Sequence, residues 1–410
     1  MCIDLGADDA GFVEIGREEI AGQREDILKF FPAAKTLIGF VCRMNRENLR
    51  SPARSMANLE LANTGNRTDS VACSIVRRLE RMGVRAVSPA MGFPMEADRW
   101  PGKMQVLSHK PIAVAAGLGK MGLHRNVIHP VFGSFVLLGT VVMDAEVDIY
   151  NRPLEYTPCL NCKLCSMACP TGAISPDGFY NPVNCLTHTY RDLIGGFTDW
   201  VENVVDSKNS YDYRRRVSDA ETISMWQSLA VSSCYKSVYC MAVCPAGEDV
   251  IEPFIENRKK YIDDVVRPLQ GREETVYVLR GSDAEDYVAK TFPHKKIKRV
   301  GNGIRPYSIE VFLGFLPVAF QRNKSDGLNA TYHFTFYGDK VEEATIVIGN
   351  KAITVTHGHT GTRDVHVRAD EKAWLRMLRK ESPMVKEIIF RRIRVRGPIK
   401  LLRAFGNCFA

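Results

Sequence analysis

The chain has 410 residues, which is enough for two or three domains that each bury a core. Its composition is ordinary for a soluble protein, no apolar run reaches membrane-spanning length, and the N-terminus shows no secretory leader. We therefore expect a cytoplasmic location, where twelve cysteines favour metal ligation over disulfides. The net charge of +8 is modest, and no motif supports nucleic-acid binding.

The first part of the chain alternates helix and strand. Residues 33–42 are apolar enough for a buried strand, and residues 71–82 place four apolar side chains on one side of a helix. Gly83 ends that helix, and residues 84–88 form the next strand. The alternation predicts an α/β layer over residues 1–150.

A glycine-rich segment follows within residues 109–139. Gly117, Gly119 and Gly122 are spaced G-x-G-x-x-G, but a dinucleotide fold needs a strand before them and an acidic residue about twenty positions after. The preceding A-V-A-A is too rich in alanine for such a strand. We interpret the glycines as a close approach of backbone to a flat or phosphate-bearing cofactor.

The most specific pattern is C-x2-C-x2-C-x3-C-P, formed by Cys159, Cys162, Cys165 and Cys169. This is the bacterial ferredoxin spacing, in which the first three thiolates bind one [4Fe–4S] cluster and the fourth binds another. A zinc knuckle usually separates its cysteine pairs by a longer span, and a disulfide knot needs an oxidising compartment.

A second set of cysteines lies downstream. Cys240 and Cys244 repeat the C-x3-C-P ending, and Cys185 stands in N-P-V-N-C-L-T. Cys234 is irregular, because a regular motif would place its cysteine at Ser237, so a longer loop must carry it back. The crossover rule gives Cys244 to the first cluster and four thiols to the second: Cys169, Cys185, Cys234 and Cys240. Four other cysteines fall outside the motifs: Cys2, Cys42, Cys73 and Cys408.

The sequence changes character after Gly271, which we take as a domain boundary. Residues 309–320 predict an apolar helix, and Tyr332, Phe334 and Phe336 alternate with polar neighbours as in a half-buried strand. Residues 371–380 predict another helix. The basic run from Arg391 to Arg403 is read as a half-buried strand with a solvated face. Attraction to an anionic membrane or an acidic redox partner is the alternative.

Residues 5–245 resemble epoxyqueuosine reductases and the related reductive dehalogenases. The resemblance is carried by A-A-G-L-G-x-x-G, F-G-S-F-V-L-L-G-T-V-V-M-D, the cysteine block followed by T-G-A-I, and N-C-L-T. It implies a nitroreductase-like α+β domain that holds cobalamin and a two-cluster ferredoxin-like domain that reduces it. The residues implied at the corrinoid are Ala115, Ala116, Gly117, Gly119, Gly122, Gly133 and Ser134.

This chain departs from that family at one position. Where epoxyqueuosine reductases carry an aspartate as proton donor, alignment on the glycine loop gives Lys103. We therefore do not expect the tRNA substrate, and the catalytic residue stays open, with Lys103, His109 and His124 as candidates. His129 lies nearby as well. Because the related nitroreductase scaffold can hold flavin, flavin is an alternative cofactor.

The last 110 residues resemble the sterol-carrier-protein type of lipid-binding domain, through L-N-A-T-Y-H-F-T-F, A-T-I-V-I and I-R-V-R-G-P-I-K-L-L-R-A-F. A purely structural module is the alternative. The expected domains are 1–150 for the corrinoid, 151–270 for two [4Fe–4S] clusters, a linker at 271–300, and a lipid-binding domain at 301–410.

Together these features predict an iron–sulfur oxidoreductase, corrinoid-dependent and acting on an apolar or lipid-like molecule. A low-potential electron donor of ferredoxin or flavodoxin type would supply it. The alternative is a two-cluster electron carrier with a lipid-binding domain and no corrinoid chemistry.

Overall fold

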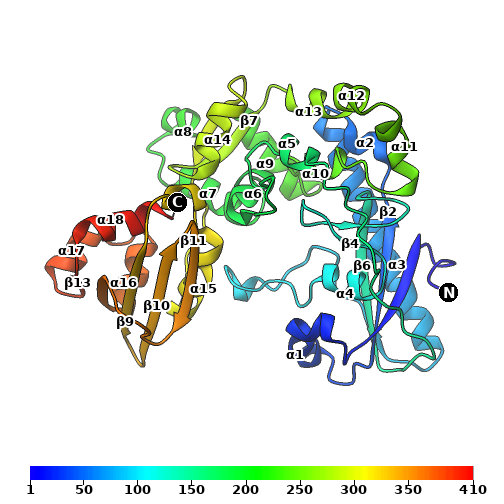
Figure 1. Ribbon diagram of the computed structural model, residues 1–410, viewed down its shortest axis with the longest axis horizontal. Coiled ribbons are helices and arrows are strands. Elements are labelled where there is room, and N and C mark those ends of the chain that lie inside the picture. Colours follow the sequence, from blue (N-terminus) through cyan, green and yellow to red (C-terminus); the bar gives the residue numbers. More distant parts are fainter. Residues whose placement is uncertain (410) are drawn as a thin grey trace. The chain divides into compact units, whose positions relative to one another are not determined.

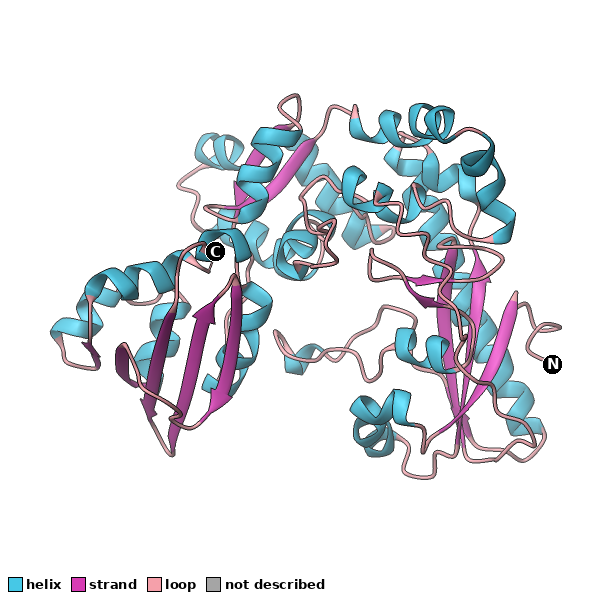
Figure 2. Cartoon of the chain, in the orientation of Figure 1, coloured by secondary structure: helices cyan, strands magenta, loops and turns pink. Residues whose placement is uncertain are grey.

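The structure is a computed structural model that describes residues 1–409 apart from the side chain of Arg99. It forms two compact units of mixed α/β structure, each with a sheet and flanking helices (Figure 2). The N-terminal unit comprises Met1–Pro170, Ile174–Tyr180 and Gln227–Arg272. The C-terminal unit comprises Thr171–Ala173, Asn181–Trp226 and Glu273–Ala410. Among the described residues, no helix combines the length and apolar character needed to span a membrane.

The N-terminal unit is built on a four-stranded antiparallel sheet in the order β1-β2-β6-β3. Its strands are β1 (Asp9–Glu14), β2 (Thr36–Arg43), β3 (Ala86–Val87) and β6 (Val136–Met143). The expected buried strand at 33–42 is β2, in which every residue but the last is buried. Such a continuous apolar run is found where both faces of a strand are covered.

Helices cover both faces of this sheet (Figure 1). The long helix α3 (Arg54–Arg81) packs Val71, Ile75 and Leu79 against one face, whereas Met82 follows the helix and is 62% exposed. Helices α1 (Ala21–Phe30) and α4 (His109–Ala115) lie on the other face. The predicted apolar stripe is thus correct over three of its four members.

Short elements complete the N-terminal unit and carry the cysteine segments. A two-stranded ribbon pairs β4 (Lys120–Met121) with β5 (Val127–Ile128). The remaining helical segments are the 3-10 turns η1 (Glu18–Ile20) and η2 (Ala97–Arg99), the π-helix η3 (Ile262–Val266), and the helices α2 (Arg46–Arg50), α5 (Leu164–Ala168), α10 (Tyr239–Ala242), α11 (Glu248–Glu256), α12 (Arg258–Tyr261) and α13 (Arg267–Gln270).

The C-terminal unit contains a five-stranded sheet in the order β11-β10-β9-β12-β13, in which only β9 and β12 pair in parallel. Its strands are β9 (Ala330–Tyr337), β10 (Val341–Gly349), β11 (Ala352–His357), β12 (Val365–Asp370) and β13 (Ile393–Arg396). The flanking helical segments are α15 (Ile309–Ala319), η4 (Arg322–Ser325), α16 (Glu371–Leu378), α17 (Met384–Ile389) and α18 (Ile399–Asn407).

The core of this unit is aromatic. Tyr332, Phe334 and Phe336 of β9 are buried, as their alternation predicted, and Phe312 and Trp374 pack edge-to-face against Phe336 from α15 and α16. These ring–ring contacts stabilise the core in addition to the burial of each ring's apolar surface. The basic run at 391–403 differs from expectation, because only its first part is a strand and α18 begins at Ile399.

Residues 271–300, expected as a linker, are folded in this unit. They form β7 (Thr275–Leu279), α14 (Asp283–Thr291) and β8 (Lys296–Val300), with β7 and β8 paired in parallel. Val276, Val278 and Phe292 belong to a small apolar cluster of their own, which explains why the segment does not remain extended. The other helices are α6 (Pro182–Thr189), α7 (Ile194–Val205), α8 (Ser210–Arg216) and α9 (Asp219–Ala230), the last of which ends in the N-terminal unit.

Candidate metal centre

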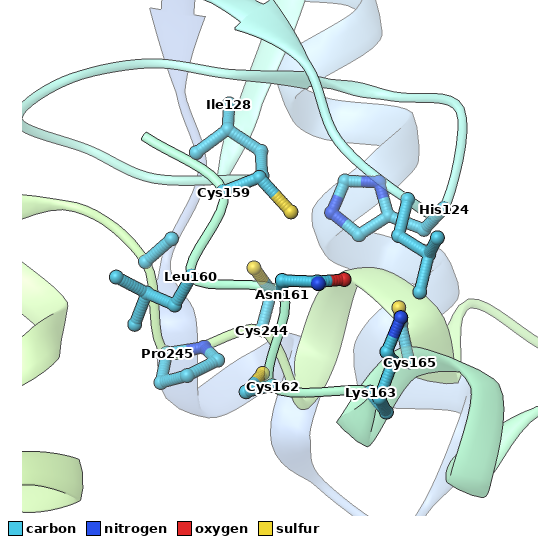
Figure 3. A pocket seen from close by; sticks show the side chains of 12 residues that line it. His124, Ile128, Cys159, Leu160, Asn161, Cys162, Lys163, Cys165, Cys244 and Pro245 are labelled. Atoms are coloured by element: carbon cyan, nitrogen blue, oxygen red, sulfur yellow. The ribbon is translucent and has the colours of Figure 1, made fainter. Parts of the chain in front are cut away.

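Four of the predicted ligands line a single cavity in the N-terminal unit. They are Cys159, Cys162 and Cys165 of the first motif and Cys244 of the second. The cavity encloses ≈ 310 Å³, part of it open to solvent, and its other walls include Ile128 and Leu160. Figure 3 shows the cysteine side chains arranged around a common space. The crossover arrangement, in which Cys244 joins the first three cysteines, is therefore the one that the fold brings together.

The first motif wraps around the cavity because its backbone turns sharply. Asn161 and Lys163 adopt left-handed φ values of 52° and 67°, which are uncommon for residues with a Cβ. Two side chains hold this turn in place. Lys163 Nζ donates to the carbonyl of Pro176, and Ser166 Oγ donates to the carbonyl of Ile174 at 2.7 Å. These bonds tie the start of α5 to the following loop and fix the thiols at its N-terminal end.

Cys244 is held in place by the segment that precedes β6. The Gly133 backbone lies so close to this loop that a Cβ there would meet the carbonyl oxygen of Ala246 at 1.9 Å. Ser134 is fully buried, its Oγ donates to the carbonyl of Met241 at 2.9 Å, and Glu248 N donates to the carbonyl of Pro130 at 2.9 Å. Gly133 and Ser134 thus position Cys244, one of the predicted ligands, whereas the resemblance implied that they contact a corrinoid.

The raised pKa values of the thiols indicate how much positive charge the cavity requires to hold thiolates. Burial raises the pKa of Cys165 to about 12, and the nearby thiols of Cys244 and Cys162 act in the same direction. Burial likewise raises the pKa of Cys244 to about 12. A thiol must be deprotonated to ligate a metal, so thiolates here require strong positive charge at the centre. Ferric and ferrous ions supply that charge, and the donor set fits an iron–sulfur cluster.

A lone metal ion fits the cavity less well. Within the described part of the chain, no three or more His, Cys, Asp or Glu side chains are arranged to hold one ion. Zinc needs its four ligands within about 2.3 Å of one point. In a [4Fe–4S] cube each cysteine binds a different iron, so the four sulfurs surround a volume instead.

His124 presents a hydrogen-bond donor to the same cavity (Figure 3). Its Nδ1 accepts the backbone N–H of Asn126 at 3.1 Å, so the neutral ring carries its proton on Nε2. Burial lowers the pKa of His124 to about 4, with the Lys110 cation acting the same way, which keeps the ring neutral. Its Nε2 is buried and finds no acceptor among the described residues. A cluster sulfur or a cysteine thiolate would satisfy it.

Replacing His124 tests this arrangement. A donor to sulfur stabilises the more negative, reduced state, so His124→Leu should lower the midpoint potential of the cluster. One net hydrogen bond of about 1 kcal/mol corresponds to roughly 40 mV for a one-electron couple. The measurement is a redox titration followed by EPR. The matched variant His124→Gln keeps a donor and should stay closer to the parent, and an unchanged potential in His124→Leu would contradict the assignment.

The second set of thiols remains a prediction. Cys169 directly follows α5 and Cys240 lies within α10, both in the N-terminal unit, and Cys234 Sγ lies 3.4 Å from the carbonyl oxygen of Ser232. Cys185 belongs to the C-terminal unit, on α6.

The cap of α6 offers a test of Cys185 as a ligand. Asn181 Oδ1 accepts the backbone N–H of Asn184 at 3.0 Å. Asn181→Ala should cost about 1 kcal/mol and lower the unfolding midpoint by roughly 2–4 °C. If Cys185 binds iron, this variant should also lose iron faster to a chelator. Asn209→Ala removes the same kind of cap from α8, which carries no cysteine, and equal loss rates in both variants would count against Cys185.

The other residues predicted at the corrinoid pack against the protein itself. Ala115, the last residue of α4, and Ala116 directly after it are buried in the apolar core. A Cβ on Gly117 would meet the carbonyl oxygen of Arg152 at 2.5 Å, and one on Gly119 would meet that of Ile128 at 2.4 Å. One on Gly122 would meet Ile128 Cδ1 at 2.6 Å. The close approach inferred from the glycines is thus to the chain's own backbone and side chains. Their contact with a corrinoid stays a prediction.

Two catalytic candidates have ordinary structural partners. Lys103 is exposed and pairs with Asp26, whose carboxylate Oδ2 lies 2.5 Å from Nζ. His109 is buried, with Nδ1 2.9 Å from Thr140 Oγ1 and Nε2 3.0 Å from the carbonyl of Ala90. Both ring nitrogens of His109 are thereby occupied. The third candidate, His124, faces the thiols, a placement that no sequence motif indicated.

Comparisons with known proteins agree with the resemblance in two separate parts of the chain. Residues 319–410 match the model of the SCP-2 sterol transfer family. A stretch of 124 residues is 31% identical to the epoxyqueuosine reductase of Escherichia coli (strain K12), covering 30% of this chain and 31% of that protein. The chain thus matches the first curated relatives over only 30–31% of their length.

Two solved structures align with part of this chain at low sequence identity. Epoxyqueuosine reductase from Streptococcus thermophilus aligns with 16% identity and a TM-score of 0.35 over 65% of this chain and 73% of that one. A catabolic reductive dehalogenase in complex with 3-bromo-4-hydroxybenzoic acid aligns with 16% identity and a TM-score of 0.37 over 65% and 33%. The predicted combination of an epoxyqueuosine-reductase-like part with a sterol-carrier-type part is confirmed.

Proposed function

We propose that this protein is an iron–sulfur oxidoreductase related to the epoxyqueuosine reductases. The observation that carries the proposal is the cavity in which Cys159, Cys162, Cys165 and the distant Cys244 meet, with the Nε2 donor of His124. A [4Fe–4S] cluster bound there supplies single electrons at low potential.

The surrounding residues have separate tasks. The four cysteines provide the thiolates, and the buried Ile128 forms an apolar wall of the cavity. His124 donates one hydrogen bond, while the apolar wall limits solvent access, and the two together set the reduction potential. Gly133 holds the Cys244 loop in reach. None of these tasks requires a proton from Lys103 or His109, whose polar atoms are engaged elsewhere.

A second candidate function is favoured by the segment from Gly117 to Gly122, which packs against other parts of the chain. Since the residues expected around a corrinoid pack against the chain itself, the protein fits an electron carrier that relays single electrons without corrinoid chemistry. We route no step through a corrinoid. Of the two candidates, the reductase is supported by the similarity to epoxyqueuosine reductase. The name of that relative says that it reduces epoxyqueuosine.

The substrate and partners are proposed from the chemistry of the two units. A sterol-carrier-type segment favours an apolar or lipid-like substrate. Rings such as Phe312, Phe334 and Trp374 fill the space between sheet and helices, so a bound lipid would have to displace them. A ferredoxin or flavodoxin-like protein would supply the electrons. Two clusters, rather than one, would follow from the eight cysteines.

Metal analysis of the anaerobically purified full chain tests the proposal. We expect about eight irons and eight sulfides per chain and a reversible one-electron titration. Incubation with a cobalamin or a flavin, followed by gel filtration, separates the candidates. Retained cobalt or flavin favours a reductase, whereas iron alone favours the carrier. Far fewer than four irons would contradict both.

A further inference from the structure

Helix α17 of the C-terminal unit turns its apolar side outward. Val385, Ile388 and Ile389 lie on one side of the helix at the i, i+3, i+4 spacing, and they are 67%, 43% and 71% exposed. Phe390, which follows the helix, is 58% exposed. We call these four side chains the α17 surface. Single exposed apolar residues are common, but four within six positions form a patch that usually marks a binding surface.

The opposite side of α17 carries a buried acid. The side chain of Glu387 is 1% exposed, and its Oε2 lies 3.3 Å from Arg392 and 3.7 Å from Arg376. Arg392 also lies over the ring of Phe390, with its guanidinium carbon 5.3 Å from the centroid. The buried side of the helix is thus held by ion pairs, and its exposed side is apolar. A helix packed only for the stability of the fold would have the reverse pattern.

Basic residues surround this surface. Between positions 380 and 403 the chain has eight Lys and Arg but only two Asp and Glu, of which Glu387 is buried. All eight basic residues are exposed, among them Lys386, Arg391, Arg394, Arg396 and Lys400. Strand β13 carries two of them directly beside α17 (Figure 1). The partner must therefore be anionic where it meets these cations and apolar where it meets the α17 surface.

We propose that the α17 surface docks the C-terminal unit on an anionic lipid bilayer. An interfacial segment inserts apolar side chains about 5–10 Å into the headgroup boundary while Lys and Arg stay among the lipid phosphates. A bilayer offers both environments at once, and anionic lipid attracts each nearby cation. A second copy of the chain would bring like charge against like. The inference does not depend on the proposed redox function.

Flotation of the full chain with lipid vesicles tests the proposal. We expect binding to phosphatidylcholine vesicles that contain about one third phosphatidylserine, and little binding to phosphatidylcholine alone. About 1 M salt, which shortens the Debye length to about 3 Å, should weaken binding. Binding that is equal for both vesicles, or absent from both, would overturn the proposal.

Variants assign the binding to this surface. Ile389→Ser with Phe390→Ser should weaken binding at least tenfold, because both side chains lose their apolar burial. Arg391→Gln with Arg394→Gln and Arg396→Gln should weaken it on the order of a hundredfold, at about fivefold per charge.

Matched controls are available away from α17. Val205→Ser with Ile255→Ser removes two similarly exposed apolar side chains, and Arg77→Gln with Arg78→Gln and Arg81→Gln removes three exposed cations of α3. Both should leave binding unchanged. Equal loss in controls and α17 variants would place the contact elsewhere.

Two other outcomes would overturn the proposal. Binding to an acidic protein but not to vesicles would make the partner a protein. Concentration-dependent sedimentation that Ile389→Ser abolishes would make the partner a second copy of this chain. Circular dichroism confirms that each variant is folded.

Discussion

Cys244→Ala should remove the first cluster, and with it about four irons per chain. The reason is geometric, since Cys244 shares a cavity with Cys159, Cys162 and Cys165 although it lies far from them in sequence. The loss is measured by iron and sulfide analysis and by the cysteinyl charge-transfer absorbance of the anaerobic protein. Cys73→Ala is the control, because this exposed residue of α3 lies outside the motifs.

Pairs of variants decide whether the clusters cross over. Cys159→Ala combined with Cys244→Ala should lose no more iron than either single change, since both thiols would serve one cluster. Cys169→Ala combined with Cys244→Ala should lose the iron of both clusters. If instead the Cys169 and Cys244 changes prove redundant, both cysteines serve the same cluster, and the crossover assignment is wrong.

Gly133→Ala should destabilise the N-terminal unit by about 2–5 kcal/mol. Left-handed backbone costs a residue with a Cβ about 1–2 kcal/mol, and forcing atoms into a packed site costs about 1–3 kcal/mol. Both apply, because φ is +63° and the new Cβ would lie 1.9 Å from the Ala246 carbonyl oxygen. The unfolding midpoint should fall on the order of 10 °C. Because the displaced loop carries Cys244, iron should also dissociate faster.

The control for this substitution is Gly22→Ala in α1. Gly22 has no atom within 4 Å of the added Cβ, and its helical backbone suits alanine. Alanine there should be neutral or stabilise by up to about 1 kcal/mol. If Gly133→Ala and Gly22→Ala behave alike, the close contact between the Gly133 segment and the Cys244 loop does not exist in solution.

Parts of the fold that follow local periodicity were predictable. The alternation of Tyr332, Phe334 and Phe336 predicted a half-buried strand because side chains alternate across a sheet regardless of the partner strand. The linker expected at 271–300 was wrong because local periodicity is weak in this segment. Its short strands pair only with each other across α14, and neither has enough alternation to be recognised alone.

The cysteine spacing by itself predicted which thiols can wrap one cluster, because a tight turn with ligands three residues apart leaves few alternatives. It could not determine what the glycines approach, since the Ala246 and Arg152 carbonyls lie far along the chain. The direction of His124 and the outward apolar side of α17 were likewise decided by tertiary structure. A side chain's surroundings are set by segments remote in sequence, which spacing and periodicity do not record.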